Sequence, residues 1–500
     1  MRFLRKKAWR ILLLAVAMLG WGSVTALAQD LQLPAGPGPE LLLEKEELVA
    51  AGVQHRMYRG LLPNGKPLVV HVIEADLHNP EVEVRPVAAA EGRYGKRESV
   101  ASLAARSGGV AAVNGGYFST AAPYLPVGNL IIDGEILAAS DIFRTSLGWL
   151  ENRSAKFGYF KPEISLVLPG GSRIPVERVN QNNAGKGLVL FTEAWGSLAG
   201  SGRELEVLVS LAPLEDGSYQ VVDRSLGNVS IPVGGLALRL DPEGPGFDQL
   251  QIGSLVRLER TWDPYWDGLR HLLTSGPLLV EGGRPVFQHA LEGFSGSLEG
   301  RHPRTAIGLT GDGKMLLVTV DGRQPGRSEG VTFEELSYLM IALGADAAMG
   351  LDGGGSTTCW VNGRVANQPS DGSQRLVANG IVVKSGIVVF LDGNRVYFDV
   401  PPLLEKGRTL VPLRAIFEAL GAEVGWDEAS RTVTAVKPEV SLSLQIDSTR
   451  ALVNDREMTL DVPARVVEGR TLVPLRFVGE ALGASVDWDP KKIIHIYTRQ

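Results

Sequence analysis

A carboxylate followed by a run of glycines is the feature of this sequence most suggestive of chemistry. Asp352 is followed by Gly353, Gly354, Gly355, Ser356 and Thr357. Glycine carries no side chain, so the backbone beside the carboxylate could approach a ligand closely. Such a site could hold an acid, a base or a nucleophile against a substrate. The alternative is a glycine-rich turn in which Asp352 caps its own backbone.

The residues before Asp352 predict a helix and then a strand that ends at the carboxylate. Thr332 and Glu335 have the spacing of a capping box, and apolar residues then recur at helical spacing as far as Leu343. Gly344 is a natural helix stop. The apolar residues 347–351 predict a buried strand, which would place Asp352 at the strand tip.

Several other predicted strands begin or end in residues of the same kinds. They are Asn114 and Gly115 after residues 108–113, Arg304 at the start of a strand, Asp321 and Arg323 after residues 315–320, and Arg375 in a loop, with Arg144 as a further candidate. Taken singly, each reads most simply as a turn former or a solvated charge. Together they could build a cleft that offers carboxylates to a sugar and guanidinium groups to a phosphate.

Composition and the N-terminus indicate a compartment. The net charge of −6 provides no nucleic-acid footprint. Residues 1–28 combine a basic start, an apolar stretch and the small-residue site Ala26-Leu27-Ala28, which is typical of a signal peptide cut after Ala28. An uncleaved anchor is the alternative. No later stretch is long enough to cross a membrane, so we expect a bacterial protein that is secreted or held in the cell envelope.

The single cysteine and the histidines limit the metal and redox chemistry. Cys359 cannot form an intrachain disulfide, and a buried, inert thiol is favoured over a catalytic one. Six histidines precede residue 386, and none has the HxH or HxxxH spacing of a zinc site. We therefore expect no metal and no cofactor in the reaction, although a structural calcium held by aspartates and carbonyl oxygens is compatible with the sequence.

The patterning predicts an α+β fold with a large, mostly antiparallel sheet and few helices. Residues 29–48 are expected to be a leader or linker, and residues 49–385 one domain. Residues 386–500 contain a repeat, because residues 407–414 (GRTLVPLR) recur as residues 469–476 at a constant offset of 62. Each repeat reads as strand, helix and strand, which predicts a small C-terminal α/β repeat domain.

With these residues assembled, residues 49–384 resemble the phosphodiester glycosidase family. The resemblance is carried by residues 113–118 (VNGGYF), 275–277 (SGP), 304–308 (RTAIG), 320–323 (VDGR) and 351–358 (LDGGGSTT). It implies hydrolysis of the bond between a sugar anomeric carbon and a phosphodiester, as in N-acetylglucosamine-1-phosphodiesters. The C-terminal repeats resemble the copper amine oxidase N-terminal-like domain. With one histidine, His495, and no cysteine, they hold too few ligands for copper, and a spacer or cell-wall polymer-binding role is expected.

The resemblance leads to specific assignments. Asp352 and Asp321 are the candidates for nucleophile or water-activating base, and Arg304 and Arg323, with Arg375, for the phosphate. Asn114, Gly115 and residues 353–357 would orient a glycan or sugar-phosphate substrate. Two alternatives stay open. One is a noncatalytic envelope protein that binds polysaccharide through the same cleft, and the other is a phosphodiesterase that cuts P–O and would normally need a metal pair.

Overall fold

The computed structural model describes residues 38–181, 187–200, 206–244, 246–405, 407–489 and 493–498. The expected signal peptide and residues 29–37 of the expected leader lie outside these ranges. Strands make up 49% and helices 10% of the structure. This confirms the expectation of a mostly antiparallel β fold with few helices. The strands are divided among several sheets and a barrel, whereas the sequence suggested a single large sheet.

The body of the molecule contains an antiparallel sheet of eight strands. In spatial order they are β1 (Glu40–Ala50), β2 (Val53–Leu61), β3 (Pro67–Asp76), β23 (Lys314–Val320), β22 (Arg304–Thr310), β24 (Ala345–Gly350), β20 (Leu278–Glu281) and β21 (Arg284–Pro285). Strand β1 occupies residues that the sequence analysis expected to be a linker, because it pairs along its whole length with β2. That expectation is wrong from Glu40 onwards.

Two five-stranded sheets complete the body. One contains β26 (Arg364–Val365), β25 (Cys359–Val361), β5 (Ala111–Asn114), β27 (Asn379–Ser385) and β4 (Val82–Ala88). The other contains β7 (Glu135–Ala138), β6 (Leu130–Ile132), β19 (Leu269–Thr274), β8 (Thr145–Leu150) and β9 (Ala155–Tyr159). One buried apolar cluster includes residues of all three sheets, such as Ile73, Val113 and Leu147, so the sheets share a core.

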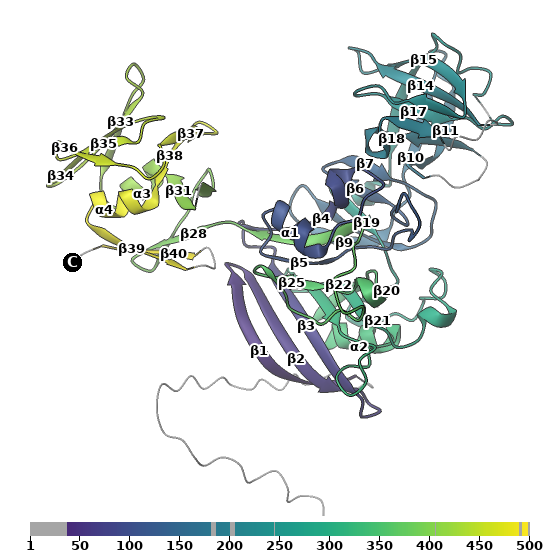
Figure 1. Cartoon of the computed structure of the whole chain (residues 1–500), viewed down its shortest axis with the longest axis horizontal. Helices are drawn as coiled ribbons and strands as arrows, with labels where there is room; N and C mark the ends of the chain where they lie inside the picture. The colour runs from purple at the N-terminus through teal and green to yellow at the C-terminus, as the bar shows by residue number, and fades with distance from the viewer. Residues whose placement is uncertain are drawn as a thin grey trace, which may run out of the picture.

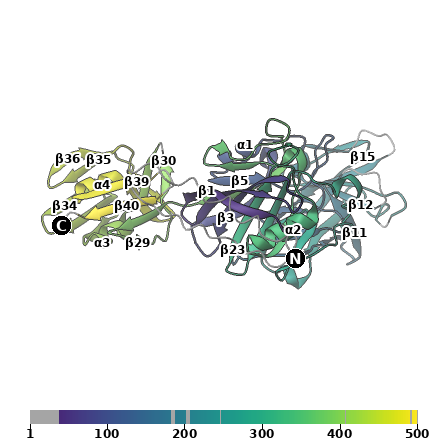
Figure 2. The same cartoon turned by 90° about the horizontal axis from the view of Figure 1, so that it is seen from below.

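A closed barrel is inserted between β9 and β19. Its strands are β10 (Glu163–Val167), β11 (Arg173–Val179), β12 (Leu188–Phe191), β17 (Leu236–Arg239), β14 (Val207–Pro213), β15 (Tyr219–Leu226) and β18 (Leu255–Thr261), with the ribbon β13 (Leu198–Gly200) and β16 (Asn228–Ser230) beside it. Its core contains Trp266, which also packs against the sheet of β6 and β19. Figures 1 and 2 place the barrel and the C-terminal repeats at opposite ends of the molecule.

The described helices are short. The α-helices are α1 (Val100–Arg106), α2 (Phe333–Ala342), α3 (Leu413–Ala419) and α4 (Leu475–Ala481), and the 3-10 turns are η1 (Ala89–Gly92), η2 (Glu193–Trp195), η3 (Pro264–Trp266), η4 (Gly296–Leu298) and η5 (Gly354–Ser356). In the part of the chain that the structure describes, no helix is long and apolar enough to span a bilayer. Helix α2 covers one face of the eight-stranded sheet through Leu336, Leu339 and Met340.

The C-terminal repeats have the predicted strand–helix–strand order. The first is β31 (Arg408–Pro412), α3 and β32 (Glu423–Asp427), and the second is β38 (Arg470–Pro474), α4 and β39 (Ala484–Asp489). Strands β31 and β38 pair antiparallel at Val411 and Val473. The repeats also exchange ion pairs, because Arg408 binds Asp461 and Arg470 binds Asp399.

Further strands extend both repeats into three sheets. They are β28 (Val388–Leu391), β29 (Asn394–Val396), β30 (Leu403–Glu405), β33 (Thr432–Lys437), β34 (Val440–Gln445), β35 (Arg450–Val453), β36 (Arg456–Thr459), β37 (Arg465–Val467) and β40 (Ile493–Thr498). Strand β28 pairs with β40 rather than with the body. Strand β27 is therefore the last strand that pairs within the body, and the strands after it pair with strands of the repeats.

The predicted capping box of α2 is present and can be tested. The Thr332 hydroxyl accepts from the Glu335 amide, and the Glu335 carboxylate accepts from the Thr332 amide. Replacing Thr332 with Ala should cost about 1 kcal/mol of local stability, because one amide loses its acceptor. Hydrogen exchange in α2 should then be about fivefold faster. The matched control is Glu334→Gln on the exposed face of the same helix turn, and equal exchange in both variants would contradict the role of the cap.

Candidate functional site

Ends of strands from two sheets meet at Asp352. Strand β24 of the eight-stranded sheet ends two residues before it, and β5 and β27 of the facing sheet end and begin nearby. The Asp352 amide donates to the Gly115 carbonyl at 3.0 Å, and the Gly115 amide donates to the Asn379 carbonyl at 3.0 Å. Motifs far apart in the sequence are thus joined by backbone hydrogen bonds where the ends of the two sheets meet.

The side chain of Asn114 holds this junction together. It has no exposed surface. Its amide nitrogen donates to the Asp352 carbonyl at 2.6 Å, and its amide oxygen accepts from the Thr305 hydroxyl at 2.7 Å and the Thr358 amide at 3.1 Å. Asn114 therefore positions the loop. The expected contact between Asn114 and substrate does not fit this buried placement.

The glycines beside the junction are needed for close packing. A Cβ atom on Gly115 would overlap the Asn379 side chain, and one on Gly355 would overlap the ion pair between Arg375 and Asp371. Gly354 has a φ of +61°, a conformation that side chains with a Cβ adopt only at a cost. These glycines bring other groups close to the carboxylate and leave little room for a ligand to contact Gly115 itself.

Asp352 combines partial exposure with a raised pKa. The residue is partly exposed. Burial raises the pKa of its carboxyl from 3.8 to about 6, and the nearby Ser356 hydroxyl, the Gly353 amide and the charge of Arg375 oppose this only in part. A carboxyl that is reachable and titrates near neutral pH is a candidate for proton transfer or nucleophilic attack.

The charges of this carboxyl and of two arginines act on the Tyr117 phenol. Burial raises the pKa of Tyr117, the charge of Asp352 raises it further, and Arg304 and Arg144 oppose the rise. The phenol consequently stays protonated at neutral pH and can donate a hydrogen bond. Sequence analysis placed Tyr117 within a motif but gave it no role, because only the fold shows which charges surround it.

Arg304 is more enclosed than a free phosphate ligand would be. Only 3% of the residue is exposed, and its guanidinium stacks 3.8 Å from the Phe333 ring centre. Its Nε and Nη2 donate to backbone carbonyls of Val331, Leu298 and Gly300. Burial lowers the pKa of Arg304 to about 10, and the charge of Arg323 adds to this. Arg304 thus contributes positive charge, with most of its donors already used.

Arg323 and Arg375 reach the glycine loop from the outer side. Arg323 is exposed and places its guanidinium beside Gly354 and 3.2 Å from His302 Nδ1. No carboxylate lies within ion-pair distance of it among the residues that the structure describes. Arg375 instead binds Asp371 at 2.7 Å. Arg323 is therefore the freer cation, and the charge of Arg375 is largely balanced.

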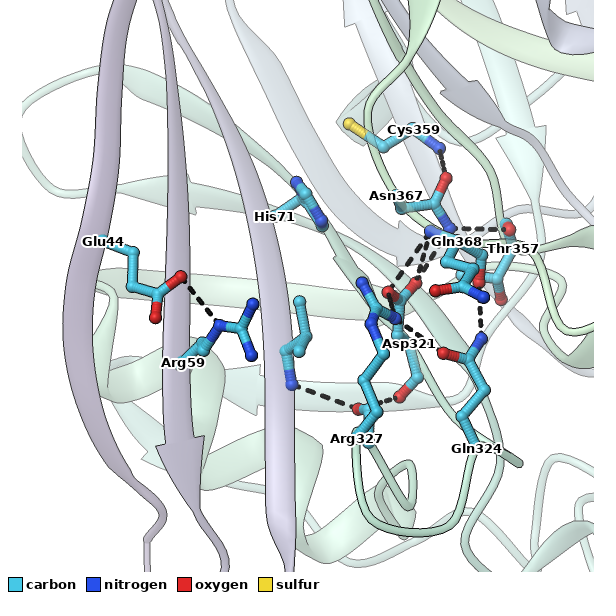
Figure 3. A network of polar contacts seen from close by, with 12 residues as sticks. Glu44, Arg59, His71, Asp321, Gln324, Arg327, Thr357, Cys359, Asn367 and Gln368 are labelled. Atoms are coloured by element: carbon cyan, nitrogen blue, oxygen red, sulfur yellow. Dashed lines mark hydrogen bonds and ion pairs between the residues drawn. The ribbon is translucent and has the colours of Figure 1, made fainter.

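Asp321 is placed as a structural residue and not as a catalytic one. Its carboxylate has no exposed surface and binds Arg327 Nη1 at 2.7 Å. The Asn367 side chain and the Gln368 amide also donate to it, as Figure 3 shows. Asn367 in turn donates to the Thr357 carbonyl. The catalytic assignment of Asp321 therefore requires correction, because a saturated and enclosed carboxylate cannot contact a substrate.

Several buried polar atoms around the junction have no hydrogen-bond partner in the described structure. They are Ser275 Oγ, Thr357 Oγ1, Thr358 Oγ1 and Asn379 Nδ2. An unsatisfied buried polar group costs about 1–3 kcal/mol, so such groups usually have a ligand, a water or a functional reason. Their gathering in the segments that meet at Asp352 adds polar groups to the candidate site.

Other groups complete the surroundings of Tyr117. Arg144 lies over the Tyr117 ring at 5.3 Å and over the Phe294 ring at 4.3 Å. The buried Glu292 carboxylate accepts from the Thr145 amide, the Thr145 hydroxyl and the Leu278 amide. Sequence analysis named Arg144 only as an additional candidate and missed Glu292. Neither carries a local signal, since Glu292 lies in an irregular loop.

The single cysteine and the possible metal ligands can be located among the described residues. Cys359 is buried, and burial raises the pKa of its thiol to about 12, as befits an inert cysteine. Within the described ranges, no three His, Cys, Asp or Glu side chains cluster as metal ligands would. The expectations about metals and cofactors remain predictions.

Comparison with known proteins agrees with the two resemblances. Residues 227–384 match the phosphodiester glycosidase family, and residues 390–496 match the copper amine oxidase N-terminal domain. The chain is 36% identical over 116 residues to the uncharacterized SPbeta prophage-derived protein YomE of Bacillus subtilis, a match that covers 23% of this chain and 18% of that protein.

Two further similarities concern an enzyme and a fold. A stretch of 71 residues is 38% identical to the bovine N-acetylglucosamine-1-phosphodiester alpha-N-acetylglucosaminidase, covering 14% of this chain and 13% of that protein. Both relatives are thus matched over less than a fifth of their length. The crystal structure of a hypothetical protein from Synechocystis matches with a TM-score of 0.60 at 21% identity, over 70% of this chain and 64% of that one. The chain is thus similar to the phosphodiester glycosidase family over residues 227–384 and to the copper amine oxidase N-terminal domain over residues 390–496.

Proposed function

We propose that the body of this protein hydrolyses the glycosidic bond of a sugar-1-phosphodiester, with Asp352 as the catalytic carboxylate. The observation that carries the proposal is the setting of Asp352. It is partly exposed, its pKa is raised to about 6, and the charges of Arg304 and Arg144 act, like its own, on the neighbouring Tyr117. A carboxylate facing a cationic region suits a substrate in which a sugar carbon adjoins a phosphate.

The chemistry follows from the leaving group. Water adds its oxygen to the anomeric carbon, and the bond from that carbon to the phosphate oxygen breaks. The free sugar and a phosphate monoester are released, and the monoester takes the bonding electron pair. Because a phosphate monoester is a weak base, with a second pKa near about 6, it needs less protonation than an ordinary alcohol leaving group.

Each group at the site has a task in this reaction. Ionised Asp352 would stabilise the positive charge that develops at the anomeric carbon, either as nucleophile or as the base that activates water. Arg323 and Arg144 would bind the departing phosphate. The positive charge of Arg304 would stabilise the negative charge that develops on this phosphate in the transition state. The protonated Tyr117 hydroxyl could donate to a phosphate oxygen.

We further propose that the substrate belongs to the cell envelope. The signal-like residues 1–28 and the single cysteine support an exported bacterial protein. Envelope polymers with sugar-1-phosphate links are then the natural class of substrate, and the C-terminal repeats would hold the protein to a wall polymer.

The first test concerns Asp352 and the bond that breaks. The wild type should release N-acetylglucosamine from its 1-phosphate methyl diester, and in ¹⁸O-labelled water the label should appear in the sugar. Asp352→Asn should lower kcat by about 100-fold or more, since an isosteric amide cannot supply the charge needed in the transition state. The matched control is Asp346→Asn at the exposed start of the same strand, β24, which should keep its activity.

The label distinguishes the alternatives. Label in the phosphate would make the protein a phosphodiesterase and overturn the proposal. An Asp352→Asn variant with full activity would remove Asp352 from the mechanism, whatever the position of the label.

The raised pKa of Asp352 predicts an unusual stability effect. The folded-state pKa of about 6 lies above the ordinary 3.8, so the folded wild type loses stability as the pH rises from about 4 through 6. The difference between the two pKa values corresponds to at most about 3 kcal/mol of unfolding free energy. Asp352→Asn does not titrate, so it should gain stability relative to wild type by about 2–3 kcal/mol between pH 4 and pH 7. Urea unfolding at the two pH values measures this, and a constant difference would show that the carboxyl titrates normally.

The two arginines that flank the glycine loop should respond differently to substitution. Arg323→Gln should raise KM for the diester by about tenfold, because a charge-assisted contact to phosphate is lost, with little change in stability. Arg304→Gln should also lower the unfolding free energy by about 2 kcal/mol or more, because buried carbonyls lose their donors. Steady-state kinetics together with thermal unfolding separates the two. Equal stability losses would contradict the different burial of the two side chains.

A further inference from the structure

Three aromatic rings lie in nearly parallel planes on the outer face of one C-terminal sheet. The sheet consists of β29, β28, β40 and β39 in that order (Figure 1). The ring centres of Phe390 and His495 are 5.2 Å apart with 15° between the planes, and those of His495 and Tyr497 are 6.1 Å apart with 13°. Tyr497 is 46% exposed, and the other two rings are half-buried. We call these three residues the aromatic strip.

The opposite face of the same strands forms the core of the repeats. Val389, Ile494 and Ile496 alternate with the strip along β28 and β40 and are buried in one apolar cluster with residues of α3 and α4. Successive residues of a strand point to opposite faces of a sheet, so the strip faces away from this core. A contiguous group of large apolar side chains on a surface is more typical of a binding site than of a packing requirement.

The first repeat provides an internal comparison. Strand β35 lies at the offset of 62 from β28, and β33 pairs with β32 as β40 pairs with β39. The counterparts of the strip, in the order of its three residues, are Leu452, Thr434 and Val436. Leu452 is 46% exposed and Val436 is 55% exposed, so this face points outward in both repeats. Because the first repeat folds without aromatic rings at these positions, the fold does not explain the strip.

The charges beside the strip limit the class of ligand. Among the described residues of the four strands, the charged side chains on this face are Arg395, Asp487 and Asp489. The guanidinium of Arg395 lies 3.7 Å from the Glu81 carboxylate of the body, which balances its charge. A polyanion is usually bound by a series of cations that follows its backbone. The described part of this face has no such series, so a neutral ligand fits it better.

A neutral glycan matches the remaining chemistry of the strip. A pyranose ring has a flat face of C–H groups, which gains from covering an aromatic ring while its hydroxyl groups stay in water. A polymer of such rings can cover several aromatic side chains at once. Asp487 is the register partner of His495, and its exposed carboxylate can accept hydrogen bonds from sugar hydroxyl groups.

We propose that Phe390, His495 and Tyr497 bind a neutral pyranose polymer, different from the phosphodiester that the body cleaves. This deepens the proposed attachment of the repeats to a wall polymer. It rests on the proposed function for the source of the polymer and is independent of the reaction. The protein would then hold one polymer through its repeats while its body acts on another.

The experiment is titration calorimetry of the full chain with chitohexaose and cellohexaose. Both are neutral β-1,4-linked hexasaccharides without phosphate, so hydrolysis of a phosphodiester does not affect the result. The wild type should bind at least one of them at millimolar concentration or below. Tyr497→Ala should weaken this binding about fivefold or more, because a stacking surface is lost. Tyr497→Phe keeps the ring and should bind as the wild type does.

The matched control is Val436→Ala, which removes the exposed counterpart of Tyr497 in the first repeat. It should leave binding unchanged, and thermal unfolding should show that every variant is folded. Failure of the wild type to bind either hexasaccharide would overturn the proposal. Binding that Tyr497→Ala leaves intact would do the same, as would binding that Asp352→Asn abolishes, since the glycan would then occupy the body.

Two further results separate this proposal from others. Tighter binding of a short oligothymidylate, lost in Tyr497→Ala, would reassign the strip to nucleic-acid bases and refute the glycan proposal. Glycan binding that depends on Tyr497, in a protein that fails to hydrolyse the methyl diester, would support the strip and remove the catalytic proposal. Hydrolysis without glycan binding would have the opposite meaning.

Discussion

The site depends on one side-chain amide that joins the eight-stranded sheet to the five-stranded sheet of β5 and β27. Asn114 ends a strand of one sheet, and its hydrogen bonds reach the strand tip of Asp352, the strand of Thr305 and the start of the strand after Thr358. A buried amide with three partners is costly to disturb, because each partner would be left without a bond in a region that excludes water. Fixing these strand ends fixes the direction of the loop between them. The glycines follow from the same constraint, because the loop must pass close to Asn379 and to the ion pair of Arg375 and Asp371.

The carboxylates of the site show how burial separates structural from chemical roles. The carboxylates of Asp321 and Glu292 are buried, and each accepts hydrogen bonds from several donors. These bonds hold the neighbouring loops in place. Asp352 accepts one backbone amide and keeps a pKa near neutrality. An aspartate thus has a structural role at position 321 and is a titratable, partly exposed group at position 352. The difference lies in how many donors the fold brings to it.

Features set by local sequence could be predicted, whereas features set by contacts between distant segments could not. The capping box at Thr332, the strand before Asp352 and the duplicated strand–helix–strand units depend on local patterns, and the structure contains them. Asp321 and Asp352 look alike in sequence, since both follow an apolar strand and precede glycine. Only contacts with Arg327 and Asn367, which depend on the whole fold, distinguish them. The barrel was likewise hidden, because its strands are short and their closure is set by long-range pairing between β10 and β18.

The partners of the arginines have a consequence for ligand binding. Arg144 and Arg304 are held against the rings of Phe294 and Phe333, whereas Arg327 and Arg375 are held by carboxylates. A carboxylate partner cancels the charge of an arginine, but an aromatic ring orients the guanidinium and leaves its net charge intact. Burial lowers the pKa of both ring-stacked arginines, which shows that their charge is poorly solvated. An anionic group bound beside either guanidinium would recover that lost solvation. The two arginines differ in one respect, because the charge of Glu292 also acts on Arg144. The Phe333 ring orients Arg304 without cancelling its charge, so Arg304 keeps more of its positive charge available to a ligand.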